Sequence, residues 1–146
     1  MTGGIRDTAI RIKLQEMTES VDMIKEHIPG SADSFERLGI VKDGIYKRVE
    51  YAVENVFDIC AILNADLHLG VPGTDEDILE NLVRHGVLTL GMRRNLKAMK
   101  GFRNIVVHRY GAIDDPLAFS ILKEHIGDFS LSREEVERFL QPASGR

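Results

Sequence analysis

Two stretches of the chain repeat apolar residues at the alternating four- and three-residue spacing of a helical seam. In residues 5–28 and 43–67, successive apolar positions are separated by 4, 3, 4, 3 and 4 residues. This period places them along one stripe of an α-helix, whereas a half-buried strand would alternate at every second residue. The pattern therefore predicts two long helices, each with a buried face. The seam residues are Ile10, Leu14, Met17, Val21, Ile24 and Ile28, then Ile45, Val49, Ala52, Val56, Ile59 and Leu63.

Capping and turn signals divide the rest of the chain into shorter helices. Thr74, followed by three acidic residues, predicts a helix start. A longer helix is expected over residues 88–110. Asp115, with a proline after it, predicts the N-cap of another helix. Residues 132–135 read Ser-Arg-Glu-Glu, which matches a capping box and predicts a last helix to about residue 140. We expect an all-α, antiparallel up-and-down bundle of four to six helices.

Length and composition favour a single domain over residues 1–146, with a flexible tail at 141–146. Hydrophobic residues make up 43% of the chain and aromatic residues 6%, so the core must be largely aliphatic. The one cysteine, Cys60, excludes an internal disulfide. No apolar run approaches the roughly 18 residues that a membrane span needs. We therefore expect a cytoplasmic protein that is not bound to a membrane.

The most informative stretch is residues 101–111, Gly-Phe-Arg-Asn-Ile-Val-Val-His-Arg-Tyr-Gly. At about 100° per residue, four of its polar side chains fill one helical arc roughly 160° wide, opposite Phe102, Ile105 and Val106. A helix buried only for packing would not be expected to carry these polar side chains together on one side. Four residues form this polar face: Arg103, Asn104, His108 and Tyr110.

Cations continue the same face upstream. Residues 91–110 contain six lysines and arginines and no acid, in a chain of formal net charge −4. A local basic stripe on an acidic protein favours an anionic ligand such as a nucleic-acid backbone. Arg93, Lys97 and Lys100 are the candidates for contacts with such a backbone. A solvated helix face would also carry charges, and is the alternative for this stripe taken alone.

Arg103-Asn104, His108 and Tyr110 together resemble the Arg-x(4–6)-His signature of HEPN domains. With the flanking Gly-Phe and Gly-Ala-Ile-Asp, residues 101–114 resemble the HepT (DUF86) toxin branch more closely. That resemblance implies an endoribonuclease whose motif helices face each other across a two-fold dimer. It also implies a partner, an MntA-type nucleotidyltransferase antitoxin, which modifies the motif tyrosine, here Tyr110, with AMP.

These residues could cleave RNA without a metal or another cofactor. His108 could take a proton from the ribose 2′-hydroxyl or give one to the leaving oxygen. Arg103 could stabilise the extra charge on the phosphate, and Asn104 could orient the imidazole or bind a phosphate oxygen. One histidine cannot easily serve as base and acid in one step, but a homodimer would supply two.

Two other functions remain open. The chain could be a non-catalytic binding module that docks on a nucleotidyltransferase or presents a substrate to it. It could also be a dimeric helical scaffold. The intact set of Arg103, Asn104 and His108 favours the ribonuclease, because a binding module would need the cations but not the histidine. The other four histidines show no metal-ligand spacing, and we assign them no function: His27, His68, His85 and His125.

Overall fold

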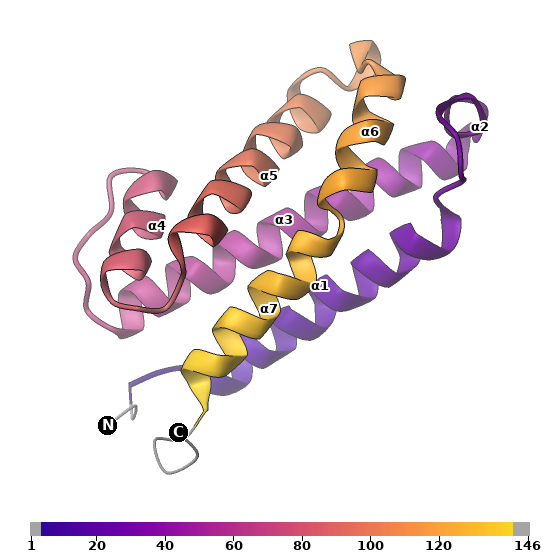
Figure 1. Ribbon diagram of the computed structural model, residues 1–146. Coiled ribbons are helices and arrows are strands. Elements are labelled where there is room, and N and C mark those ends of the chain that lie inside the picture. Colours follow the sequence, from indigo (N-terminus) through magenta and orange to yellow (C-terminus); the bar gives the residue numbers. More distant parts are fainter. Residues whose placement is uncertain (1–3, 142–146) are drawn as a thin grey trace.

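The computed structural model describes residues 4–141, apart from the side chain of Tyr110. Within that range the chain forms helices and no strands, so the predicted all-α fold is confirmed (Figure 1). In residues 4–141, six α-helices have ten residues or more, and a seventh has five. The elements are α1 (Asp7–His27), α2 (Ala32–Glu36), α3 (Ile40–Asp66), α4 (Asp75–Arg84), α5 (Leu90–His108), the 3₁₀ turn η1 (Tyr110–Ala112), α6 (Asp115–His125) and α7 (Gly127–Leu140).

The two predicted seams pack against each other. Helices α1 and α3 run antiparallel along the length of the molecule (Figure 1). Eleven of the twelve seam residues are buried, and Ile28, just beyond α1, is partly buried against the core. Burying one such side chain fully contributes roughly 1.5–3 kcal/mol. This pair of helices is therefore the frame on which the other elements are placed.

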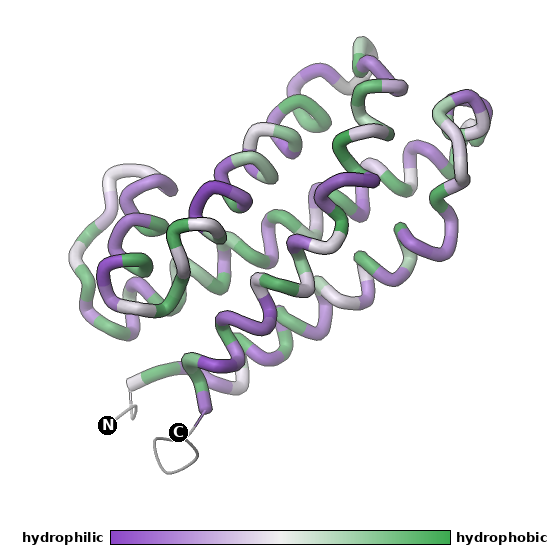
Figure 2. The backbone as a smooth tube through the Cα atoms, in the orientation of Figure 1, coloured by the Kyte–Doolittle hydropathy of each residue, from purple (hydrophilic) through white to green (hydrophobic). Residues whose placement is uncertain are grey.

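Helices α5 and α6–α7 complete the bundle. Helix α5 runs antiparallel to α3, and the chain then returns through α6 and α7 (Figure 1). Between these last two helices, Ile126 keeps helical backbone angles (φ −58°, ψ −31°), so the chain bends there without a loop. The C-terminal end of α5 lies at the same end of the bundle as η1 and α2. In Figure 2, hydrophilic and hydrophobic segments alternate along the helices, as amphipathic packing requires.

The predicted start of the last helix at Ser132 is wrong. Ser132 is buried inside α7, where its hydroxyl donates to the backbone carbonyl of Phe129 (2.7 Å). Glu135 instead accepts hydrogen bonds from the backbone N–H and the hydroxyl of Thr89, both at 2.9 Å. A Ser-x-x-Glu sequence makes a capping box only when the serine stands outside the helix. Here the helix already begins at Gly127, five residues earlier.

Helix α4 begins as predicted, whereas α6 begins one residue earlier than predicted. Thr74 caps α4 in a complete capping box with Asp77. The cap of α6 is Asp114, whose carboxylate accepts from the backbone N–H of Leu117 (3.0 Å), and not Asp115. Asp115 faces α3 instead and accepts hydrogen bonds from Lys42 and Tyr46, each at 2.6 Å. The segment after α5 is therefore fastened to α3.

Cys60 is fully enclosed in the core. Burial, with a smaller contribution from the charge of Asp75, raises the pKa of its thiol to about 12. Its role is therefore packing, as expected for a thiol inert at neutral pH. Among the described residues, none of the helices combines the length and the apolar character needed to cross a membrane.

Candidate functional site

The last two turns of α5 carry the polar motif. Phe102 and Val106 are buried against the bundle, Arg103 is partly buried, and His108 is exposed at the last helical residue. The split into a packed and a polar side is confirmed for these residues. Ile105, expected on the packed side, is 40% exposed. The motif thus stands at a helix end with one side on the core and the other open.

The guanidinium of Arg103 is held by two side chains. One terminal nitrogen, Nη2, lies 2.7 Å from Oε2 of Glu54 on α3. The other, Nη1, donates to Oδ1 of Asn104 at 3.2 Å. Its Nε is buried and has no hydrogen-bond partner in the described part of the chain. The arginine is therefore fixed at its two tips, by its own helix and by a second one.

His108 lies beyond this network. Its side chain is exposed, and among the described residues it has no hydrogen-bond or ion-pair partner. Asn104 stands one turn before it, as the spacing predicted, but its side-chain oxygen accepts from Arg103 instead. An imidazole without an internal partner can accept a proton from a substrate or donate one to it. In this state Asn104 contacts the arginine and does not orient the histidine.

Backbone geometry changes immediately after the histidine. Arg109 has left the helix (φ −124°, ψ 29°), and η1 begins at Tyr110. The helix expected over residues 88–110 therefore ends two residues earlier, at His108. The side chain of Tyr110, the predicted modification site, lies outside the described part of the chain. The backbone of Tyr110 lies in η1, the short turn that follows the motif helix α5.

The predicted cationic stripe is largely paired with acids. Arg93 contacts Glu80 (2.6 Å), and Lys100 lies between Asp75 (3.3 Å) and Glu76 (3.1 Å). All three carboxylates belong to α4, so these contacts fasten α4 to α5. Lys97 is exposed and forms no hydrogen bond or ion pair among the described residues, although it lies near enough to Glu76 to interact with that carboxylate electrostatically.

These pairs affect the ionisation of the residues that form them. Burial acts to lower the pKa of Lys100, but its hydrogen bonds to Glu76 and Asp75 outweigh that effect and raise it. The hydrogen bond from Lys100 lowers the pKa of Glu76. Both groups therefore remain charged at neutral pH.

Two grooves run along α5, and the first of them has both Arg103 and Glu54 in its walls. One, of about 230 Å³, runs between α3 and the middle of α5, and has Lys100 and Phe57 in its walls. The other, of about 380 Å³, lies beside the end of α5, between Lys47 and Val107. Sequence reasoning missed Glu54 in this setting. It is 49 residues from Arg103 in a long helix, and nothing in the local pattern distinguishes it from other exposed carboxylates.

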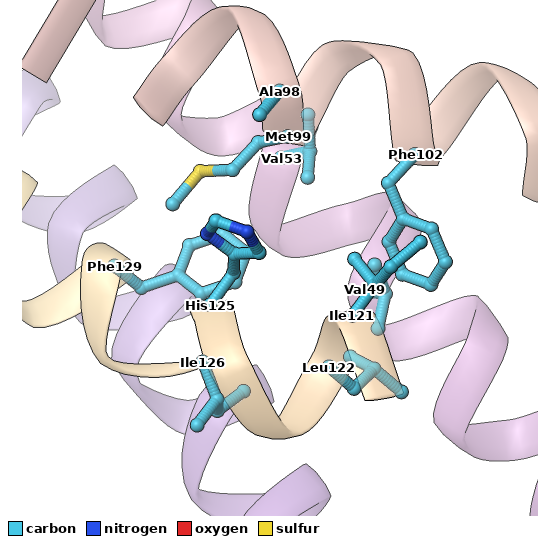
Figure 3. Close-up of a pocket in the computed structure, with 10 residues that line it drawn as sticks. All are labelled: Val49, Val53, Ala98, Met99, Phe102, Ile121, Leu122, His125, Ile126 and Phe129. Atoms are coloured by element: carbon cyan, nitrogen blue, oxygen red, sulfur yellow. The ribbon is translucent and has the colours of Figure 1, made fainter. Parts of the chain in front are cut away.

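The apolar pocket in Figure 3 is not a binding site of this kind. It lies among α3, α5, α6 and α7, holds about 20 Å³, and is lined mainly by aliphatic and aromatic side chains. That volume is enough for about one water molecule. His125 lines it, and its two ring nitrogens lie 2.8 Å from Asp128 and 2.8 Å from Glu124. In residues 4–141, no three His, Cys, Asp or Glu side chains are grouped so that they could hold a metal ion.

A helical bundle with an arginine and an exposed histidine at the end of one helix is HEPN-like in its class. The chain belongs to the ribonuclease HepT-like family, whose model matches residues 17–141. The branch expected from residues 101–114 is thereby confirmed.

The mRNA nuclease HepT of Shewanella oneidensis is 26% identical over 104 residues, covering 71% of this chain and 78% of the relative. Among solved structures, a tri-AMPylated HEPN toxin of Shewanella oneidensis in complex with an MNT antitoxin superposes with a TM-score of 0.79. The superposition covers 88% of this chain and 96% of the toxin, at 23% identity. The cytosolic protein YutE of Bacillus subtilis also superposes with a TM-score of 0.79, covering 93% and 91% of the two chains at 16% identity. At these identities the two structures establish the shared fold.

Proposed function

We propose that the protein is an endoribonuclease toxin that cleaves RNA without a metal ion. The observation that carries this proposal is an exposed His108, without a hydrogen-bond or ion-pair partner in the described part of the chain, at the end of the same helix that presents Arg103. Membership of the ribonuclease HepT-like family supports the same activity. RNA supplies its own nucleophile, so the protein needs to move protons and stabilise charge.

The proposed reaction is an internal transfer at phosphorus. The 2′-oxygen of the ribose bonds to the adjacent phosphorus while a base takes its proton. The bond from phosphorus to the 5′-oxygen breaks, and that oxygen receives a proton. The products are a 2′,3′-cyclic phosphate and a 5′-hydroxyl. His108 provides the proton transfers, a function that typically contributes about 10²–10⁴-fold. Arg103 stabilises the negative charge that grows on the phosphate oxygens.

The proposed active form is a two-fold homodimer. Each protomer offers one histidine at this site, whereas the reaction uses a base and an acid. A dimer that brings two α5 ends together supplies both groups, and two arginines for one phosphate. We further propose that Lys97 binds the RNA backbone. Arg93 and Lys100 would join it where RNA phosphates displace the carboxylates that these two residues now contact. Such a toxin would act on RNA in the cytoplasm.

The proposed regulator is an MntA-type nucleotidyltransferase antitoxin. The structurally similar Shewanella toxin was solved in an AMPylated form with an MNT antitoxin. In this chain the proposed acceptor is Tyr110, two residues after His108. Transfer of AMP from ATP to the phenolic oxygen would release pyrophosphate and place a nucleotide next to the catalytic residues. Its bulk, with about one negative charge, would exclude the RNA phosphate.

The test is RNA cleavage by the purified protein and its variants. His108→Ala and Arg103→Ala should each reduce cleavage by at least 10²-fold while the helical circular dichroism spectrum stays unchanged. EDTA should leave the wild-type rate unaltered. Loss of activity with EDTA, restored by a divalent metal, would refute the metal-independent mechanism. Absence of cleavage by the wild-type protein would favour the alternative function, a binding module that docks on the nucleotidyltransferase. The pairing of Arg93 and Lys100 with acids is compatible with that function, because a docking module has no need of free cations on α5.

A further inference from the structure

Arg103 is held from outside its own helix by one carboxylate. Glu54 is at the middle of α3, and its Oε2 lies 2.7 Å from Nη2 of the arginine. The two side chains are 30% and 38% exposed, so the pair lies at the wall of the groove and not in the core. No other hydrogen bond or ion pair joins Arg103 to a different element among the described residues. Glu54 is thus the external anchor of the motif arginine.

The other carboxylates on this part of α3 have different partners. Glu50, one turn earlier, pairs with Lys47 on the same helix (3.3 Å). Asp58, one turn later, pairs with Lys13 on α1 (3.3 Å). Within the described residues, Glu54 is the α3 carboxylate that bridges to α5. Its contact is therefore particular to the motif and is not a general property of the acidic face.

Two anchors give the guanidinium a defined plane. Arginine carries five N–H groups in a rigid, planar fork, so contacts at both tips fix its orientation. Here Nη2 is bound to Glu54 and Nη1 to Asn104, while Nε–H is buried. One N–H on each terminal nitrogen is left for another acceptor. Two such donors match two oxygens of a phosphate.

We infer that Glu54 is a positioning residue, which holds Arg103 in the orientation that stabilises the scissile phosphate. This inference rests on the proposed ribonuclease function. Without Glu54, the arginine would keep its charge and its contact with Asn104 on the same helix, but would lose the contact that fixes it to α3. Displacement of a catalytic group by about 1 Å can cost about 10²-fold in rate. A partly exposed ion pair contributes little to stability, so the loss should fall on catalysis.

The experiment compares Glu54→Gln and Glu54→Ala with Glu50→Gln, the matched control one turn away. We expect Glu54→Gln to lower the cleavage rate at saturating RNA by about 10–10²-fold. Glu54→Ala, which also lacks the acceptor oxygen, should lower it further. Binding of an RNA with a 2′-deoxy scissile nucleotide should change less than about threefold, because the charge of Arg103 remains. Glu50→Gln should match the wild-type protein in both measurements.

A double variant separates positioning from an independent effect. In an Arg103→Ala background, Glu54→Gln should cause no further loss, since there is no guanidinium left to hold. A further loss there, or wild-type rates for Glu54→Gln alone, would refute the inference. A faster Glu54→Gln enzyme would also refute it, because Glu54 would then restrain the arginine from RNA.

A readout without RNA distinguishes this inference from the function on which it rests. The Nε–H resonance of Arg103, assigned by its loss in Arg103→Lys, should shift or broaden in Glu54→Gln and stay unchanged in Glu50→Gln. A wild-type protein that fails to cut RNA would refute the proposed function while this resonance still reported the anchoring. An unchanged resonance in Glu54→Gln would refute the anchoring itself.

Discussion

The ammonium group of Lys42 lies 2.6 Å from the carboxylate of Asp115 and ties the first turn of α3 to the first turn of α6. Tyr46 donates to the other oxygen of the same carboxylate, also at 2.6 Å. The segment that carries Tyr110 runs between the end of α5 and this anchor. The two contacts therefore determine where the chain goes after the motif helix.

Asp115→Asn should destabilise the fold in a pH-dependent way. Burial acts to raise the pKa of Asp115, but the hydrogen bonds from Lys42 and Tyr46 outweigh it, and the pKa lies below its usual range. The stabilisation is thus complete above the unfolded pKa of about 4, and is lost as the pH falls through the lower folded pKa. At pH 7 we expect a loss of about 1–3 kcal/mol.

Urea unfolding at pH 7, 4 and 3 measures this effect. The difference between the wild-type protein and Asp115→Asn should shrink as the pH falls below about 4. Asp114→Asn is the matched control, because asparagine and aspartate are about equally good N-caps, so this variant should lose only a few tenths of a kcal/mol. A constant difference between wild type and Asp115→Asn at all three pH values would contradict the ionic anchor.

Lys97→Ala should weaken RNA binding, and the binding that remains should depend less on salt concentration than that of the wild-type protein. Lys97 forms no hydrogen bond or ion pair among the described residues and interacts with Glu76 through its charge, so its contact with a phosphate would release a counterion. The slope of log affinity against log salt should fall by about 0.7 for a single-stranded RNA. Lys100→Ala should change the slope less, because its charge is already balanced by Asp75 and Glu76. Equal changes in the two variants would show that RNA displaces these carboxylates.

The sequence was sufficient to predict the bundle because its determinants are local or periodic. The seams of α1 and α3, the cap at Thr74 and the polar face of α5 all depend on residues within a few turns of each other. The wrong helix start at Ser132 has a physical cause. A Ser-x-x-Glu sequence that forms a capping box at a helix start is equally compatible with the interior of a helix that began earlier. Glu135 is used elsewhere, since it accepts from Thr89, 46 residues away in the sequence.

The sequence identifies candidate residues for the site, whereas the contacts between them are visible only in the structure. Arg103 and His108 are visible as a motif on one helix, whereas the anchoring of Arg103 by Glu54 joins two helices. The pairing of Arg93 and Lys100 with α4 likewise depends on tertiary packing, because the sequence shows the cations as an uninterrupted stripe. Charge patterns along one helix identify the candidates for binding, and the neighbouring helices decide which of them are free.

Tyr110→Phe should remain folded and toxic but escape the antitoxin. The change removes the phenolic oxygen, which is the proposed acceptor of AMP, and keeps the ring. Co-expression with the nucleotidyltransferase should protect cells that make the wild-type protein and fail to protect cells that make the variant. Mass spectrometry of the co-expressed pair should find an adenylyl increment on the wild-type peptide that contains Tyr110. An active variant that the partner still silences would exclude this residue as the regulatory site.

Gly101→Ala should produce a more stable protomer and a weaker dimer. Glycine inside a helix costs about 1 kcal/mol relative to alanine. Apart from the adjacent residues and backbone of α5 itself, a Cβ at Gly101 would meet no atom of the described chain within 4 Å, so the substitution should raise the free energy of unfolding of the isolated protomer by about 0.5–1 kcal/mol.

The same Cβ would lie on the stripe of the motif, because Gly101 and His108 are seven residues apart on one helix. If two α5 helices meet along this stripe, the added methyl group separates them. Light scattering over a micromolar dilution series should then report earlier dissociation for Gly101→Ala than for the wild-type protein. Gly91→Ala, in the first turn of α5, is the control, because its Cβ would make only an ordinary contact, 3.9 Å from Thr89. A Gly101→Ala dimer as tight as wild type would place the two-fold contact elsewhere, and a wild-type monomer that cuts RNA at full rate would exclude the shared site.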